Sequence, residues 1–255
     1  MAQNKANNSV LAVIPARYAS TRFPGKPLVD IAGKSMLQRV YEQVQKAKLV
    51  SQCLIATDDK RIFDHVSRFD GKVMMTREDH QSGTDRVAEV AENFPDSEVI
   101  LNVQGDEPFI DPDQIDLVVK TLTKNPDHKI ATLAKAIKTE EALFNPNVVK
   151  LVFNQEKEVM YFSRSAIPFV RNQPKEDWLN HGKFFKHIGL YGFKREALLS
   201  ITKLERSHYE ITESLEQLRW LEAGFSIVAT ITEKESIGID TPEEQDKVRA
   251  LAKEL

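Results

Sequence analysis

Three cations lie within ten residues of one another, directly after the first apolar run of the chain: Arg17, Arg22 and Lys26. No Asp or Glu occurs in residues 15–27, so nothing inside this loop neutralises them. A merely basic surface loop would normally carry acidic residues among its cations. Gly25 allows close approach of the backbone, and the prolines of the loop restrict its motion. Fixed cations and donors are what a triphosphate requires, so the loop predicts phosphate binding.

A carboxylate follows another apolar run. Asp106 comes directly after Gly105 at the end of a predicted strand, a suitable position for a magnesium ligand beside phosphates. An Asp in such a turn is more often structural, because it can bond its own backbone. The interpretation therefore needs a second carboxylate, and Asp240 is the candidate. Its alternative role is helix capping beside Thr241.

The third polar cluster covers residues 76–86. Helix capping accounts for Thr84 and Asp85, which would lie at the start of a helix. Capping does not account for the other polar side chains of the cluster, which suit recognition of hydroxyls or a base: Arg77, His80 and Gln81.

Several familiar sites are excluded. Gly33-Lys34-Ser35 resembles the end of a Walker A motif, but the earlier glycine would fall on Leu28. The chain has no G-x-G-x-x-G, no H-E-x-x-H and no G-x-S-x-G. These absences argue against a P-loop NTPase, a Rossmann dehydrogenase, a zinc peptidase and an α/β-hydrolase.

The elements that must position these clusters alternate along the first half of the chain. Apolar runs at residues 10–14, 53–56, 72–75 and 99–103 predict buried strands. Helical periodicity between them predicts helices around residues 36–44, 62–66 and 87–91, the first of them capped by Ser35. This order predicts an α/β fold with a mostly parallel central sheet, in which ligands bind at the carboxyl ends of the strands.

The pattern changes after about residue 130. Strands are predicted at residues 130–137, 148–153, 159–162 and 184–193, a polar irregular excursion at 171–182, one helix over 210–223 and a strand at 226–231. A last helix is predicted to begin at Thr241. We interpret residues 1–255 as a single domain with an inserted β-rich region at about 156–206.

Composition narrows the class of protein. The chain is 41% hydrophobic and 29% charged, with a formal net charge of −3, too balanced for a non-specific nucleic-acid binder. The one cysteine, Cys53, excludes an internal disulfide and every multi-cysteine metal site. No signal peptide and no apolar stretch of membrane-spanning length is apparent, so we expect a cytoplasmic protein.

Eight segments occur in the order of one known family. They include Pro-Ala-Arg-Tyr-Ala-Ser-Thr-Arg-Phe-Pro-Gly-Lys-Pro at 15–27, His-Gln-Ser-Gly-Thr-Asp-Arg at 80–86, Asn-Val-Gln-Gly-Asp-Glu-Pro at 102–108 and Gly-Ile-Asp-Thr-Pro at 238–242. The chain resembles the 3-deoxy-manno-octulosonate (KDO) cytidylyltransferases over nearly its whole length. The resemblance implies a three-layer α/β/α sandwich of the nucleotide-diphospho-sugar transferase type. It also implies CTP and KDO as substrates, CMP-KDO and pyrophosphate as products, Mg²⁺ as cofactor, a role in lipopolysaccharide synthesis and a homodimer formed largely through residues 156–206.

The resemblance also implies roles for individual residues. Those expected to take part in the reaction are Arg17, Arg22, Lys26, Asp106 and Asp240, the last two as magnesium ligands. The nucleotide side adds Ala16, Ser20 and Gln104. The sugar side comprises Arg77, Gln81, Arg164, His187, Tyr191, Glu213 and Gln217. For His187, which lies in an apolar run, a hydrogen-bonded core histidine is the alternative. We expect neither a dedicated nucleophile nor a histidine base, because nucleotidyl transfer depends on positioning and charge neutralisation.

Three other functions remain open at this point. A cytidylyltransferase for amino-KDO or sialic acid would share the nucleotide site. A glycosyltransferase of similar fold would carry an Asp-x-Asp motif, but the only candidate, Asp111-Pro-Asp113, more plausibly opens a helix. A non-catalytic nucleotide-binding protein would not need both carboxylates.

Overall fold

The apolar run after the N-terminus forms strand β1, and the other apolar runs form the strands that flank it. The computed structural model describes residues 9–19, 23–235 and 238. The strands are β1 (Ser9–Ala16), β2 (Asp30–Ile31), β3 (Lys34–Ser35), β4 (Gln52–Thr57), β5 (Val73–Met75), β6 (Ser97–Asn102), β7 (Ile130–Ala136), β8 (Lys150–Phe153), β9 (Val159–Ser163), β10 (Phe185–Lys194) and β11 (Ile227–Ile231).

The helices follow the strands much as the periodicity predicts. They are α1 (Met36–Gln45), α2 (Lys60–Arg68), α3 (Gly83–Glu92), α4 (Pro112–Lys124), α5 (Glu140–Phe144), α6 (Trp178–His181), α7 (Arg195–Ile201), α8 (His208–Glu213) and α9 (Gln217–Glu222). Two short 3₁₀ segments lie at Lys26–Leu28 and Lys175–Asp177. None of the helices in the described part of the chain is long and apolar enough to cross a membrane.

The central sheet has the strand order β11-β7-β10-β6-β1-β4-β5. Along this path every neighbouring pair is parallel except the two pairs that β10 makes, with β6 and with β7. The prediction of a mostly parallel sheet is therefore confirmed. The hairpin β8–β9 extends the sheet beside the first residues of β10.

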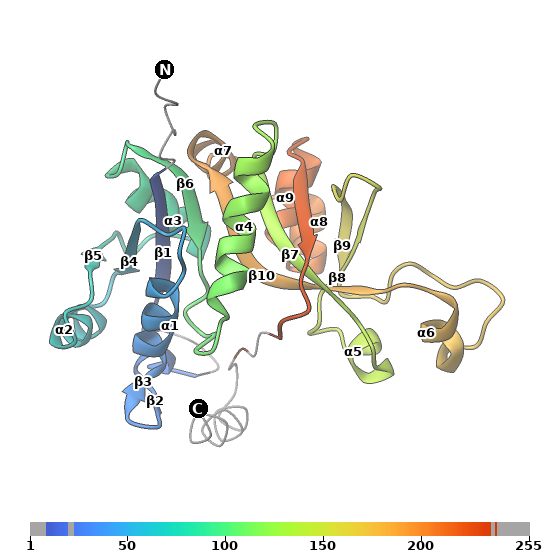
Figure 1. The fold of residues 1–255 in the computed structure, drawn as a ribbon, viewed down its shortest axis with the longest axis horizontal. Coiled ribbons are helices and arrows are strands. Elements are labelled where there is room, and N and C mark those ends of the chain that lie inside the picture. The colour runs from blue at the N-terminus through green and yellow to red at the C-terminus, as the bar shows by residue number, and fades with distance from the viewer. Residues whose placement is uncertain (1–8, 20–22, 236–237, 239–255) are drawn as a thin grey trace.

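Helices cover both faces of this sheet (Figure 1), and a cluster of buried apolar residues lies on each side of it. Alternate residues of β1 face opposite sides, as the two-residue period of a strand requires. Val10, Ala12 and Ile14 pack with α1, α2 and α4, whereas Leu11 and Val13 pack with α3, α7 and α9. The carboxyl ends of the parallel strands are thus brought to one edge of a three-layer α/β/α arrangement.

Capping side chains mark the first residues of several helices. The hydroxyl of Ser35 accepts a hydrogen bond from the backbone N–H of Gln38, which confirms the predicted cap of α1. Asp111 caps α4 with Pro112 in its first turn, so the Asp-Pro-Asp motif does open a helix. The cap of α3 differs from the prediction: Ser82, not Thr84, caps it, in a capping box with Asp85.

The predicted helix over residues 210–223 was wrong as a single element. Ser214 adopts a left-handed conformation with φ of 51°, which ends α8. The chain resumes as α9 three residues later. The interruption leaves Glu213 and Glu216 free to bond other elements.

The predicted irregular excursion over residues 171–182 is also only partly right. It contains α6 and the preceding 3₁₀ turn, and Trp178 is buried in a small apolar cluster with Phe144 and Phe184. Apolar burial of one large aromatic side chain orders this otherwise polar segment. Within residues 156–206, β10 lies in the middle of the central sheet, between β6 and β7.

Candidate active site

The predicted phosphate loop and the predicted magnesium carboxylate meet at the carboxyl edge of the sheet. Lys26 Nζ lies 2.7 Å from Asp106 Oδ2. The contact follows from topology, because β1 and β6 are adjacent parallel strands and each side chain lies in the loop that follows its strand. The Lys26 side chain is 12% exposed and that of Asp106 33%, so the pair is partly open to solvent.

Glycines let the two loops approach each other. Gly25 has φ of 73°, and its N–H donates to the carbonyl of Tyr18, which closes the cationic loop before the 3₁₀ turn. A Cβ on Gly105 would lie 3.2 Å from the carbonyl oxygen of Pro15. The close approach of the β6 loop to the end of β1 therefore depends on glycine at position 105. Ser20 and Arg22 lie outside the described residues.

Arg17 contacts the protein rather than open solvent. Its guanidinium donates to the carbonyl oxygens of His80 and Ser82, the latter at 3.1 Å. Burial lowers the pKa of this guanidinium, and the nearby positive charge of Arg86 lowers it further. Arg17 thus links the end of β1 to the loop that precedes α3. Ala16, the last residue of β1, is buried beneath it.

Gln104 connects the β6 loop to β10. Its side-chain nitrogen donates to the carbonyl oxygen of Gly189 at 3.3 Å. Because β10 carries His187 and Tyr191 on either side of Gly189, this contact joins the nucleotide half of the predicted site to the sugar half.

An ion pair that was not predicted from the sequence joins α3 to the carboxyl edge of the sheet. Arg86 is fully buried; one of its nitrogens lies 2.5 Å from Asp58 Oδ2, and another donates to the hydroxyl of Thr76. The three residues come from the ends of β4 and β5 and from α3. The signal available in the sequence was the position of Asp58 directly after a predicted strand, at the carboxyl edge of the sheet.

Arg77 and Gln81 lie apart from the other predicted sugar-binding residues. Both line a polar cavity between the loop before α3 and residues 202–206. Gln81 donates to the carbonyl of Asp79, and the Arg77 backbone N–H donates to Glu89. The Glu89 carboxylate also bonds the ring of His80, which anchors this loop on α3.

Arg164 and Glu213 are held together. The Glu213 carboxylate accepts hydrogen bonds from the Ser163 hydroxyl at 2.7 Å and from the Arg164 N–H at 2.9 Å. The Arg164 guanidinium donates to the carbonyl oxygens of Glu213, Pro146 and Ser214. These bonds fix the interruption between α8 and α9 against β9.

His187 and Tyr191 form an aromatic pair on β10, with ring centroids 5.2 Å apart. His187 Nε2 lies 2.9 Å from the Thr132 hydroxyl, and burial lowers the pKa of the imidazole to about 3. The Tyr191 hydroxyl is buried and has no hydrogen-bond partner among the described residues. Burial, and secondarily the charge of Glu216, raise its pKa well above the ordinary value.

A partly exposed carboxylate joins α9 to the start of α3. Glu216 accepts hydrogen bonds from the hydroxyls of Ser82 at 3.1 Å and Thr84 at 3.0 Å, and it lies 3.0 Å from a nitrogen of Arg219. Burial raises the pKa of Glu216. The next residue, Gln217, is buried. Sequence reasoning named Gln217 but missed Glu216.

The donor set near Asp106 suits magnesium delivered with a nucleotide. Among the described residues there is no group of three or more His, Cys, Asp or Glu side chains that could hold a metal ion. Mg²⁺ is usually bound by one or two carboxylates together with substrate phosphates, so a single partly exposed aspartate beside a phosphate loop fits it. Asp240, the second predicted ligand, lies outside the described residues.

A mostly parallel sheet with a lysine and an aspartate in contact at its carboxyl edge is the arrangement expected of a nucleotidyltransferase. A sequence profile of the cytidylyltransferase family matches residues 11–235. The chain is 52% identical over 241 residues to the 3-deoxy-manno-octulosonate cytidylyltransferase of Cytophaga hutchinsonii, covering 94% of this chain and 96% of the relative. It is also 52% identical over 245 residues to that of Parabacteroides distasonis, with the same coverage.

A comparison with solved structures points to the same family. The structure of CMP:2-keto-3-deoxy-manno-octonic acid synthetase complexed with CTP superposes with a TM-score of 0.90 at 42% identity, covering 97% of this chain and all of the other. The chain belongs to the 3-deoxy-manno-octulosonate cytidylyltransferase family. The fold type and the family expected from the sequence are confirmed.

Proposed function

We propose that this protein transfers the CMP group of CTP to the anomeric hydroxyl of KDO and releases pyrophosphate. The observation that carries this proposal is the agreement, over 97% of the chain, with a synthetase of this class solved with CTP. The new bond joins the sugar oxygen to the α-phosphorus of CTP. The bond from that phosphorus to the pyrophosphate oxygen breaks, and the hydroxyl gives up its proton.

On the nucleotide side, Arg17, Arg22 and Lys26 hold the phosphates, and Ala16, Ser20 and Gln104 line the nucleotide. The contact between Lys26 and Asp106 supports this arrangement, since it puts a cation and a potential metal ligand at one point. The cations offset the repulsion between the triphosphate and the carboxylate of the sugar.

Magnesium dependence is part of the proposal, with Asp106 and Asp240 as its protein ligands. When bound, Mg²⁺ would supply charge neutralisation at the α-phosphate and would lower the pKa of the attacking hydroxyl. The partial exposure of Asp106 beside a phosphate loop supports this assignment.

On the sugar side, we assign hydroxyl and carboxylate recognition to Arg77, Gln81, Arg164, His187, Tyr191, Glu213 and Gln217. A pKa of about 3 keeps His187 neutral at physiological pH, which suits a hydrogen-bonding role better than that of a general acid. The Tyr191 hydroxyl finds no partner in the described part of the chain, which supports its assignment, because buried polar groups normally have a partner.

We also propose a cytoplasmic homodimer that serves lipopolysaccharide synthesis, with residues 156–206 at the dimer contact. Met160 and Phe169, at 66% and 74% exposure, support this contact, because large apolar side chains are seldom left so open without a partner. Light scattering on purified protein tests the dimer, and Met160→Asp should shift it toward monomer.

The experiment that tests the reaction is identification of its product. Incubation with CTP, MgCl₂ and KDO should yield a species with the mass of CMP-KDO, and omission of any one component should abolish it. A product with amino-KDO or sialic acid but none with KDO would favour the related cytidylyltransferases instead. CTP binding without any product would favour a non-catalytic nucleotide-binding protein.

A further inference from the structure

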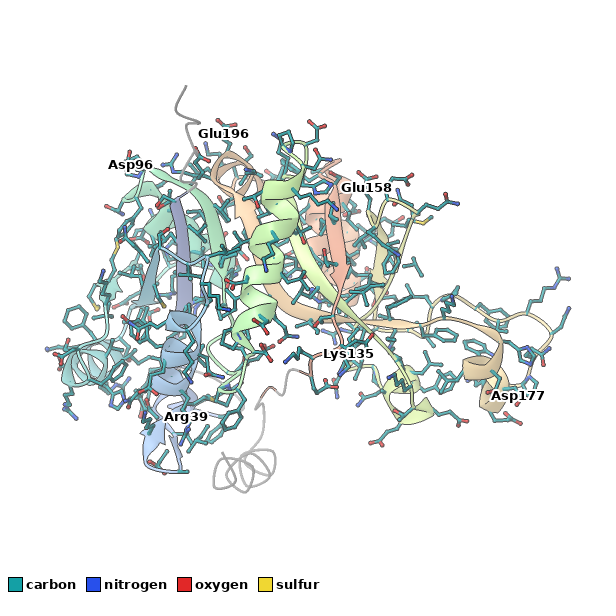
Figure 2. The ribbon with its side chains drawn as sticks, viewed as in Figure 1. Arg39, Asp96, Lys135, Glu158, Asp177 and Glu196 are labelled. Atoms are coloured by element: carbon teal, nitrogen blue, oxygen red, sulfur yellow. The ribbon has the colours of Figure 1, made fainter. Side chains whose placement is uncertain are left out.

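A fully buried lysine lies at the open end of the hairpin formed by β8 and β9. In Figure 2, Glu158 lies at the turn between these two strands. Lys150, the first residue of β8, lies at the opposite end of the hairpin and has a relative exposure of 0%. Lysine is almost never fully buried unless its charge is partnered. The partners of its ammonium group therefore indicate what the residue does.

Backbone carbonyl oxygens surround the ammonium group of Lys150. Its Nζ donates to the carbonyl oxygens of Asn145 at 3.0 Å and Val148 at 2.7 Å, both in the turn before β8. A third bond goes to the carbonyl oxygen of Arg164, in the segment after β9. An ammonium group has three N–H donors, so the three acceptors match it. Lys150 thus joins the turn before β8 to the segment after β9.

The backbone of Arg164 is held from two sides. Its carbonyl oxygen accepts from Lys150, and its N–H donates to the Glu213 carboxylate at 2.9 Å. The Arg164 guanidinium reaches back to the turn before β8, where it donates to the carbonyl oxygen of Pro146 at 3.0 Å. Removing the ammonium group of Lys150 would therefore loosen the backbone to which Glu213 is bonded.

Lys150 also lies opposite the second partner of Glu213. Lys150 and Ser163 are directly opposed in the pairing of β8 with β9. The Ser163 hydroxyl donates to the Glu213 carboxylate at 2.7 Å, and Glu213 is the last residue of α8. The carboxylate of Glu213 is thus bonded to two successive residues of the hairpin end that Lys150 closes.

We propose that Lys150 is a positioning residue for the sugar half of the site, which fixes the backbone of Arg164 and thereby the arrangement of Arg164 and Glu213. This inference rests on the proposed roles of Arg164 and Glu213 in sugar binding. Lys150 is inaccessible, so it acts through these two residues and not on the substrate. Its loss therefore weakens the binding of KDO and leaves the binding of CTP unchanged.

The test is the variant Lys150→Met, which keeps an unbranched apolar side chain and removes the ammonium group. The KM for KDO should rise about threefold to tenfold, the effect expected of losing a hydrogen bond that orders the site. The KM for CTP should change by less than about twofold. Lys150→Gln retains two N–H donors and should show a smaller rise in the KM for KDO, and it replaces Lys150→Met if that variant does not fold.

Asp116→Ala is the matched control for lost stability. Asp116 is buried at 4% exposure, and its carboxylate accepts from the backbone N–H groups of Lys48 at 3.1 Å and Leu49 at 2.9 Å. It is thus a charged side chain that holds a turn, but this turn precedes β4 and lies opposite the carboxyl edge of the sheet. Both Asp116→Ala and Lys150→Met should unfold at a lower urea concentration than the wild type. Only Lys150→Met should alter the KM for KDO.

Hydrogen exchange measures the positioning without turnover. The N–H of Arg164, which is bonded to Glu213, should exchange about tenfold faster in Lys150→Met than in the wild type. In Asp116→Ala the same N–H should exchange at the wild-type rate. Nuclear magnetic resonance on the full chain follows this single amide.

Two results would overturn the inference. One is an unchanged KM for KDO in a folded Lys150 variant, which would confine Lys150 to stabilising the fold. The other is an equal rise of that KM in Asp116→Ala, which would mean that any loss of stability weakens sugar binding. If the wild type formed no product with any sugar, the proposed function would fail instead. The exchange rate of the Arg164 N–H would then still show whether Lys150 fixes this backbone.

Discussion

Lys26 Nζ and Asp106 Oδ2 lie 2.7 Å apart at the carboxyl edge of the sheet. Sequence reasoning assigned the lysine to phosphate and the aspartate to magnesium, from loops separated by about 80 positions. The contact balances the two charges against each other. Under the proposed roles, binding of a nucleotide with its metal would exchange this pair for phosphate against lysine and cation against carboxylate.

Replacing Asp106 should separate the proposed metal binding by this residue from the proposed phosphate binding by Lys26. Asp106→Ala removes the metal carboxylate and releases Lys26, so turnover should fall by about a hundredfold or more. CTP binding should lose its dependence on Mg²⁺ while metal-free binding is retained. Calorimetric titration of CTP with and without MgCl₂ measures both. Unchanged Mg²⁺-dependent binding and turnover would remove Asp106 from the site.

The buried pair of Asp58 and Arg86 should matter for stability. Asp58→Ala leaves the guanidinium of Arg86 buried without its carboxylate, which should cost about 3–5 kcal/mol of unfolding free energy. Urea denaturation followed by circular dichroism measures the loss. Asp64→Ala is the control, because it cuts only the exposed pair with Lys60 and should cost less than about 1 kcal/mol. Equal costs for the two variants would contradict the importance of the buried pair.

His187 should make stability fall in mild acid. Its pKa of about 3 in the folded protein lies below the ordinary 6.5 of the unfolded chain, so below pH 6.5 the unfolded state binds one more proton. The contribution of His187 is complete above pH 6.5 and is lost as the pH falls toward 3. Relative to His187→Gln, the wild type should lose about 1.4 kcal/mol more per pH unit in this window. Parallel pH dependences of the two proteins would exclude this account.

Glu216 should matter for the contact between α9 and the start of α3. Glu216→Gln retains one acceptor oxygen but gives up the charge that faces Arg219 and one of the two hydroxyl bonds to Ser82 and Thr84. We expect a loss of about 1–3 kcal/mol in stability and a higher KM for KDO, because Gln217 is the adjacent residue. Steady-state kinetics at fixed CTP check the second expectation. An unaltered KM for KDO would confine Glu216 to a structural role.

Sequence patterns predicted the strands and helix caps that depend mainly on the local sequence. The continuous apolar run at residues 10–14 is typical of a buried parallel strand, and Ser35 and Asp111 occupy the positions where caps are favoured. The clusters that follow β1 and β6 were predicted to lie at the carboxyl ends of strands, where ligands bind in such sheets. That they meet follows from the adjacency of β1 and β6, which the structure shows.

Features set by tertiary contacts escaped the same reasoning. The left-handed conformation of Ser214 has no sequence signal, since serine rarely adopts it, so one helix was predicted where two occur. The bonds of Glu216 and of Glu235 join elements more than 40 residues apart, and ordinary surface residues of the same types look identical in a sequence. Only the fold shows that these carboxylates have fixed partners.

Release of pyrophosphate tests the central claim most directly. Purified protein is mixed with CTP and MgCl₂, and release is compared for KDO, amino-KDO, sialic acid and no sugar. We expect rapid release with KDO and background release without sugar, with the other two acids far slower than KDO. Release with sialic acid or amino-KDO in preference to KDO would contradict the assignment of the sugar. No release with any sugar, from folded protein that binds CTP, would contradict the activity itself.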